Sequence, residues 1–117
     1  MDISNEHSAT EKAQLTALAK WRGGRARIWE YTPTLSRLTL RLESNKMTGN
    51  LHIVCGGCQH IRGPFHWDNC DLAIECAQGP GGELIHTIRD SHADFELRCW
   101  VVSLLENVEP VYSASLS

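Results

Sequence analysis

The clearest pattern in the chain is a strict alternation of apolar and polar residues over residues 37–43. Leu38, Leu40 and Leu42 occupy one phase, and charged or hydroxyl side chains occupy the other. This period of two is typical of a β-strand with one face in the core and one face in water. The same pattern predicts further strands over residues 25–32, 51–55, 71–76, 84–89 and 95–105. A helix over residues 100–107 is an alternative, but the β-branched and aromatic residues there favour a strand.

Only the N-terminal region has the composition and spacing of a helix. Ser8 is a good N-cap for a helix over residues 9–22, which are rich in strong helix formers. Leu15 and Leu18 form a narrow apolar stripe along it. Gly23-Gly24 then ends the predicted helix.

The connections between the predicted strands are short and rich in turn residues, which favours antiparallel pairing of neighbours. Residues 44–50 and the glycine-rich residues 78–82 are two such connections. We therefore expect an α+β fold in which one N-terminal helix packs on a curved antiparallel sheet of about six strands. The sheet would be a meander or a partly closed barrel with the helix over its open side. A single domain of 117 residues is expected, with residues 1–7 and 111–117 as flexible tails.

Composition and charge narrow the function only by exclusion. Apolar residues make up 42% and charged residues 21% of the chain, as in ordinary globular proteins. The formal net charge of −3 argues against a nucleic-acid partner, because general nucleic-acid binders concentrate lysine and arginine. The basic cluster Lys20, Arg22, Arg25 and Arg27 lies at the predicted helix end, where cations complement the helix dipole.

The sequence also predicts no membrane partner and a cytoplasmic location. No segment approaches the roughly 18 consecutive apolar residues of a membrane span. The first residues lack the basic and apolar regions of a secretory signal. Five cysteines is an odd number for a disulfide framework, so free or metal-bound thiols in a reducing compartment are expected.

Residues capable of chemistry are crowded together between residues 55 and 70, which hold three of the five cysteines and two of the six histidines. Two of the cysteines there have the C-x-x-C spacing that allows thiolates to share one zinc ion from a tight turn. The best tetrahedral ligand set is Cys55, Cys58, His66 and Cys70, with His60 and Cys76 as further candidates. Against zinc, Cys55 lies on the core-facing phase of its strand, and free cysteine is among the most buried residue types. Buried thiols without a cofactor are therefore the favoured interpretation.

A thiol-dependent enzyme is a further alternative. Cys58 could act as a nucleophile if a histidine accepted its proton and a carboxylate oriented that histidine. His66 or His86 could be the base, and Asp68 or Asp90 the orienting group. Nothing in the spacing singles out one such set, so no catalytic residue is assigned.

Aromatic side chains provide the remaining candidate surface. Phe65 and Trp67 flank His66 in the loop of residues 58–70, where they could line a pocket for a small molecule or a peptide. Large aromatic residues in loops more often turn inward and plug the end of a sheet. Three further aromatic residues are expected on strand faces opposite the core, namely Trp29, Tyr31 and Trp100. An exposed apolar patch of this kind favours a homodimer or a protein partner.

The sequence therefore predicts a non-catalytic binding or interaction module that works through this aromatic surface and the loop of residues 58–70. A structural zinc domain is the first alternative, and a small thiol-dependent enzyme is the second.

Overall fold

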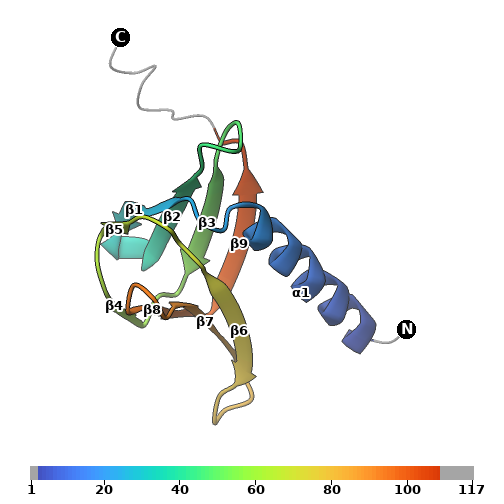
Figure 1. Ribbon diagram of the computed structural model, residues 1–117. Coiled ribbons are helices and arrows are strands. Elements are labelled where there is room, and N and C mark those ends of the chain that lie inside the picture. Colours follow the sequence, from blue (N-terminus) through green and yellow to red (C-terminus); the bar gives the residue numbers. More distant parts are fainter. Residues whose placement is uncertain (1–2, 109–117) are drawn as a thin grey trace.

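In a computed structural model, the backbone is described for residues 3–108 and the side chains for residues 12–108. Within that part, the chain forms one α-helix, one short 3-10 helix and nine strands (Figure 1). The helices are α1 (Ile3–Lys20) and η1 (Pro33–Leu35). The strands are β1 (Arg25–Thr32), β2 (Arg37–Glu43), β3 (Leu51–Gly56), β4 (His60–Arg62), β5 (His66–Trp67), β6 (Ala73–Gln78), β7 (Leu84–Asp90), β8 (Phe95–Cys99) and β9 (Val101–Glu106). The tail expected over residues 111–117 lies outside the described residues.

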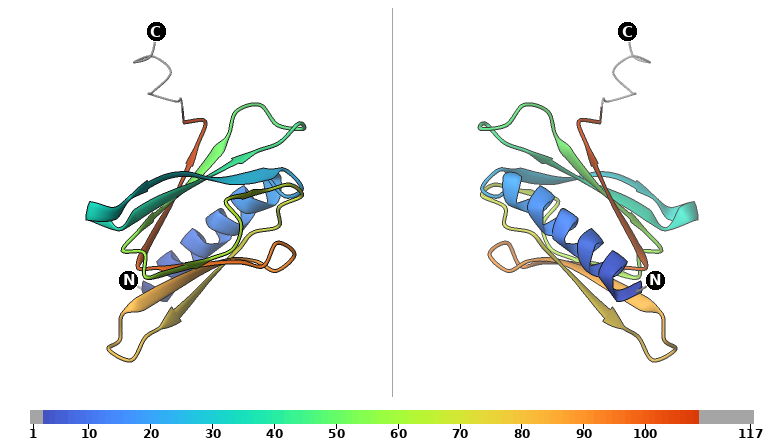
Figure 2. Two further views of the ribbon diagram at one scale, coloured as in Figure 1. Left: turned by 90° about the vertical axis from the view of Figure 1, so that its left-hand side faces the viewer. Right: turned by 90° about the vertical axis from the view of Figure 1, so that its right-hand side faces the viewer.

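The described strands form two antiparallel sheets that face each other (Figure 2). The five-stranded sheet has the order β5-β1-β2-β3-β9, and the four-stranded sheet has the order β4-β8-β7-β6. The expected α+β class and the antiparallel pairing are confirmed. The single sheet of six strands is wrong in detail, because the strands divide between two sheets and do not close into a barrel.

The core lies between the two sheets. The alternating residues of β2 and β3 face it as their pattern predicts, and the buried ones include Leu38, Leu40, Leu42, Leu51 and Ile53. The four-stranded sheet contributes Ile88, Phe95 and Leu97 from the opposite side. Burying each such side chain stabilises the fold by about 1.5–3 kcal/mol, so these two faces hold the sheets together.

Two neighbouring chain segments pass from one sheet into the other at a shared corner. β3 continues through residues 57–59 into β4, and β8 continues through Trp100 into β9. β3 pairs with β9 in the five-stranded sheet, and β4 pairs with β8 in the four-stranded sheet. The predicted strand over residues 95–105 is therefore confirmed as extended, but it is divided between two sheets. The Cys-Gly-Gly-Cys stretch lies at this corner.

The helix stands on the side of the molecule where β9 and β6 are the outermost strands (Figure 2). Among the helix side chains that the structure describes, Leu18 is buried in the core, and Trp21, just after the helix, is buried as well. Lys20 Nζ lies 3.5 Å from Glu106 Oε1, which joins the helix end to β9. Leu15 is 56% exposed, so the apolar stripe predicted for the helix contacts the core at one position only.

The bounds of α1 differ from the sequence prediction. The helix begins at Ile3, so residues 3–7 are helical and Ser8 lies inside the helix instead of capping it. No glycine or proline interrupts residues 3–20, and a helix continues past a residue that could cap it when nothing stops it. The stop at the glycine pair is confirmed, because α1 ends at Lys20 and Gly23 has a φ of +87°. Among the described residues, no helix has the length and apolar character that crossing a membrane requires.

A bulge in β1 changes which side chains share a face. The register between β1 and β2 shifts between Ile28 and Glu30, which leaves Trp29 as an extra residue. After the bulge, Tyr31 lies opposite Leu38, a core-facing residue. Directly opposed residues point to the same face of a sheet, so Tyr31 and Trp29 lie on opposite faces. The prediction that both belong to one patch is therefore wrong.

Candidate functional site

The corner that contains the Cys-Gly-Gly-Cys stretch is a fixed turn between sheets. Gly57 has a φ of +63°, a backbone conformation that favours glycine, and a Cβ there would lie 3.0 Å from the indole ring of Trp100. The amide of Cys58 donates to the carbonyl of Ser36 at 2.9 Å, and the amide of Gln59 donates to Arg98 at 2.9 Å. Gly57 therefore allows close packing under Trp100, and hydrogen bonds hold Cys58 and Gln59 in place.

The thiols of Cys55 and Cys58 at this corner both have raised pKa values. Cys55 is fully buried against Cys99, and this contact together with burial raises the pKa of Cys55. Cys58 is half-buried and donates to the carbonyl of Cys55 at 3.5 Å. Burial raises the pKa of Cys58 to about 11. A thiol-dependent enzyme needs a thiolate near neutral pH, so Cys58 is poorly suited to the role of nucleophile.

The four zinc candidates do not converge. Cys70, in the loop between β5 and β6, is buried against the turn between α1 and β1. Its thiol donates to the carbonyl of Trp21 at 3.4 Å. His66 is exposed on β5, and Cys55 faces the core at the sheet corner. Within the described residues, no three histidine, cysteine, aspartate or glutamate side chains are grouped closely enough to hold a metal ion. The zinc hypothesis therefore has no support in this geometry.

Asp90 is a structural hub, although the sequence suggested it as a group that orients a catalytic histidine. Its side chain is fully buried at the end of β7. One carboxylate oxygen accepts hydrogen bonds from Trp67 Nε1 at 2.8 Å and from the amide of Asp71 at 2.8 Å. The other accepts from the amides of His92 at 3.1 Å and Ala93 at 3.4 Å. Asp90 thus ties the segment around β5 to the turn between β7 and β8.

The loop aromatics separate into a plug and a surface residue. The ring of Trp67 lies 4.6 Å from that of Phe95, centroid to centroid, so Trp67 closes the core between the sheets. The inward interpretation is therefore confirmed for Trp67. Phe65 is 76% exposed, and its carbonyl accepts a hydrogen bond from Ile28 at 2.7 Å. The two residues do not line a common pocket.

The outer face of the five-stranded sheet carries a buried cation–π cluster. The guanidinium of Arg41 lies 4.4 Å from the centroid of the Trp29 ring, and Arg41 Nη1 lies 3.1 Å from His52 Nε2. Arg41 Nε contacts Glu43 Oε2 at 3.4 Å. Burial, and then the charge of Arg41, lower the pKa of His52. Trp29 therefore covers Arg41 and His52 instead of offering a free aromatic ring.

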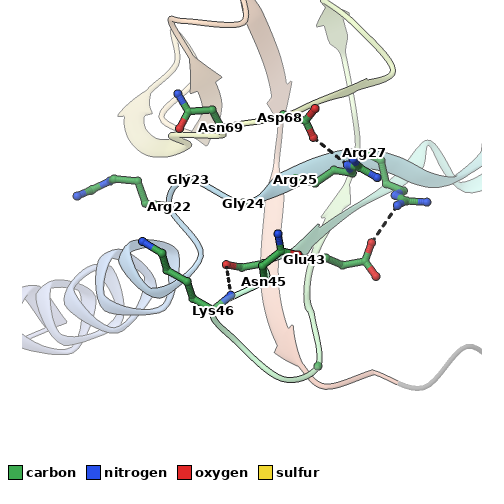
Figure 3. Close-up of a pocket in the computed structure, with 12 residues that line it drawn as sticks. Arg22, Gly23, Gly24, Arg25, Arg27, Glu43, Asn45, Lys46, Asp68 and Asn69 are labelled. Atoms are coloured by element: carbon green, nitrogen blue, oxygen red, sulfur yellow. Dashed lines mark hydrogen bonds and ion pairs between the residues drawn. The ribbon is translucent and has the colours of Figure 1, made fainter.

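A polar hollow of about 800 Å³ lies beside the C-terminal end of α1 (Figure 3). Three segments line it: the turn from α1 into β1, the turn from β2 into β3, and the loop before Cys70. The side chains that line it and can carry charge are Arg22, Arg25, Arg27, Lys46, Glu43 and Asp68. Arg25 Nε bonds Asp68 Oδ1 at 2.8 Å, which raises the pKa of Arg25 and lowers that of Asp68.

The sequence did not predict the burial of three of these residues, Arg41, His52 and Asp90. Arg41 and His52 were placed on polar strand phases, which predicted exposure, yet both are buried. The feature that relates Arg41 to His52 is the pairing register of β2 and β3, because the two residues lie directly opposite each other. Asp90 follows an apolar strand and precedes a turn, a position where a carboxylate commonly accepts hydrogen bonds from following amides.

Together these features define the class of the protein as a small α+β domain of two antiparallel sheets with one helix at their open side. Comparison with protein-family models, with curated proteins and with solved structures gives no match for this chain.

Proposed function

We propose that this protein is a non-catalytic interaction module whose partner is a second copy of the same chain, paired edge to edge through β9. One observation carries the proposal: β9 is the outermost strand of its sheet, and it is uncharged from Val101 to Leu105. Val101 is 58% exposed and Leu105 is 50% exposed. Proteins usually protect an exposed edge strand with charges, proline or a bulge, because such an edge pairs readily with another chain.

The backbone of β9 supports pairing on its free side. The amide of Asn107 donates to the directly opposed Asn50 at 2.7 Å, and such hydrogen-bonded pairs recur at every second residue of an antiparallel ladder. Val101, Ser103 and Leu105 therefore bond to β3. It follows that the amides and carbonyls of Val102 and Leu104 point away from β3, towards the free edge.

In the proposed dimer, a second copy would pair with this edge in one register. A two-fold axis through Ser103 would pair Val102 with Leu104 of the second copy, and the reverse, through their outward backbone groups. On the outer face, Val101 would then lie opposite Leu105 of the second copy, and Ser103 would lie opposite Ser103 of the second copy. Apolar residues meet apolar residues in this arrangement, and no like charges are opposed.

The end of β9 is held firmly, which lowers the entropy lost on pairing. Asn50 Nδ2 donates to the carbonyl of Val108 at 2.9 Å, and the amide of Val108 donates to Asn50 Oδ1 at 3.1 Å. At the other end, Trp100 is 55% exposed and packs over Gly57. Of the aromatic residues predicted to form an interaction surface, Trp100 is the one that adjoins this edge.

Sedimentation equilibrium of the full chain tests the proposal. We expect a concentration-dependent dimer that Leu105→Glu converts into a monomer, because the change places a charge opposite the apolar Val101 of the second copy at both ends of the paired edge. Leu84→Glu is the matched control, since Leu84 is similarly exposed (45%) but lies on β7 of the other sheet. A wild-type chain that stays monomeric at all concentrations would refute the proposal, as would equal dissociation by the two variants.

A cross-link tests the register. Ser103→Cys would place two cysteines directly opposite each other at the two-fold axis, within the Cβ separation of about 4.5–5.5 Å that opposed residues have. Mild oxidation should then give a disulfide dimer that joins residue 103 to itself, as identified by mass spectrometry. Ser91→Cys, on the exposed turn between β7 and β8, should give none.

A cytoplasmic location forms part of the proposal. Its support is that the five cysteines are all free thiols and that three of them are buried. Free thiols are typical of proteins in a reducing compartment.

A further inference from the structure

We infer that the polar hollow beside the end of α1 binds a small polyanion of phosphate or carboxylate chemistry. This site is separate from the β9 edge, and the inference does not depend on the proposed dimer. The hollow measures about 800 Å³. Ligand sites in proteins commonly measure about 300–1,000 Å³, so this space is large enough for a small molecule.

Positive charge is concentrated in this hollow on a chain whose net charge is negative. Four cationic side chains and two carboxylates line it, whereas the whole chain has a formal charge of −3. The cations come from separate segments, with Arg22 on the turn after α1, Arg25 and Arg27 on β1, and Lys46 on the turn after β2. Such a local excess attracts and orients anions.

The two carboxylates leave much of this positive charge available. Glu43 is shared between two guanidinium groups, with Oε1 at 3.0 Å from Arg27 Nη2 and Oε2 at 3.4 Å from Arg41 Nε. Arg25 and Asp68 form a pair whose side chains are 56% and 76% exposed. Because an ion pair between exposed side chains is weak, a ligand oxyanion can replace Asp68 at little cost.

The two remaining cations, Arg22 and Lys46, are also exposed. Arg22 contacts Asp71 at 2.9 Å through a similarly exposed pair, and Lys46 forms no ion pair with any described residue. Figure 3 shows Arg22 and Lys46 extending to one side of the hollow and Arg25 and Arg27 to the other. A ligand with two anionic groups can therefore contact both sides.

The lining also indicates the class of ligand. Arginine presents paired N–H donors that match the oxygens of phosphate and carboxylate groups. None of the lining residues is aromatic, so nothing in the hollow would stack on a nucleobase or another flat ring. Asn45 and Asn69 add side-chain donors and acceptors for hydroxyl groups. The expected ligand is compact, polar and rich in oxyanions.

Titration of the full chain by calorimetry and by ¹H–¹⁵N NMR tests this inference. Pyrophosphate and citrate are the two probes, one for phosphate and one for carboxylate chemistry. We expect at least one probe to bind saturably and to shift the amides of Gly23 and Asn69, while the amide of Gly57 at the distant sheet corner stays unchanged. The probe that binds more tightly identifies the source of the oxyanions.

Matched variants separate a built site from general charge attraction. Arg25→Gln and Lys46→Gln should each weaken binding by about tenfold, as expected for loss of one charged hydrogen bond. Arg62→Gln is the control, because Arg62 pairs with Asp94 at a similar exposure (56% and 85%) on the other sheet. Equal weakening by Arg62→Gln, or no saturable binding of either probe, would overturn the inference.

Discussion

The buried carboxylate of Asp90 offers the sharpest test of how the two sheets are joined. Asparagine is nearly the same size as aspartate, but it replaces one acceptor oxygen by an NH₂ donor and removes the charge. In the Asp90→Asn variant, the side-chain NH₂ group takes the place of one acceptor oxygen. Whichever way the amide turns, two of the N–H groups that donate to Asp90 then face this NH₂ donor and lose their acceptor. Because His92 is exposed, the less costly orientation keeps the remaining oxygen towards Trp67 and Asp71.

The size of the effect follows from these contacts. A hydrogen bond to a charged group contributes about 1.5–3 kcal/mol, and part of the loss at His92 and Ala93 is recovered by water. We therefore expect Asp90→Asn to lower the free energy of unfolding by about 2–4 kcal/mol. Since domains of this kind have a total stability of about 5–15 kcal/mol, the loss is large. The melting temperature should fall by on the order of 10 °C.

Urea unfolding followed by circular dichroism measures this loss. Asp94→Asn is the matched control in the same turn, because its side chain is 85% exposed and its φ of +53° suits asparagine. The control should change stability by less than about 0.5 kcal/mol. A double-mutant cycle with Trp67→Phe should give a coupling of about 1 kcal/mol with Asp90→Asn. Equal stability of Asp90→Asn and Asp94→Asn, or strict additivity in the cycle, would refute the role of this carboxylate.

Three further predictions concern the cation–π cluster and the sheet corner. The folded-state pKa of His52 lies below its ordinary value of 6.5, so the neutral ring stabilises the fold above that pH and this contribution is lost as the pH falls below it. Unfolding free energies at about pH 7 and about pH 5 should therefore differ more in the wild type than in His52→Gln, and an equal difference would contradict the assignment. Because the pKa of Cys58 is raised to about 11, its alkylation by iodoacetamide, followed by peptide mass spectrometry, should accelerate steadily from neutral pH up to that value. An alkylation rate that levels off near neutral pH would contradict the raised pKa of Cys58. Gly57→Ala should destabilise the fold by about 1 kcal/mol more than Gly82→Ala. Both glycines have a positive φ, but a Cβ at Gly57 meets Trp100 while one at Gly82 meets nothing within 4 Å. Chemical denaturation measures the unfolding free energies of the two variants. Equal losses of stability would show that the Cβ contact with Trp100 does not destabilise Gly57→Ala.

The candidate site shows where sequence reasoning fails for a physical reason. The spacing of Cys55 and Cys58 suits a metal, but spacing does not give the direction in which each thiol points. In the fold, Cys55 faces the core at the sheet corner. Cys70 is buried elsewhere, and its thiol donates to the carbonyl of Trp21 just after α1. A bulge at Trp29 likewise reversed the phase of Tyr31, and no pattern in the sequence marks that bulge.

The sequence by itself determined the strands of the core and the stop of the helix. Successive side chains of a strand point to opposite faces, so one face had to hold Leu38, Leu40 and Leu42. The helix stops before Gly23 because glycine adopts a positive φ without strain. Only the tertiary structure decided that β3 and β8 turn a corner into a second sheet, that Asp90 is buried and fully hydrogen-bonded, and that β9 is left at an edge. These features depend on which segments meet across the core. Such meetings are fixed by packing between residues far apart in the chain, and local patterns do not encode them.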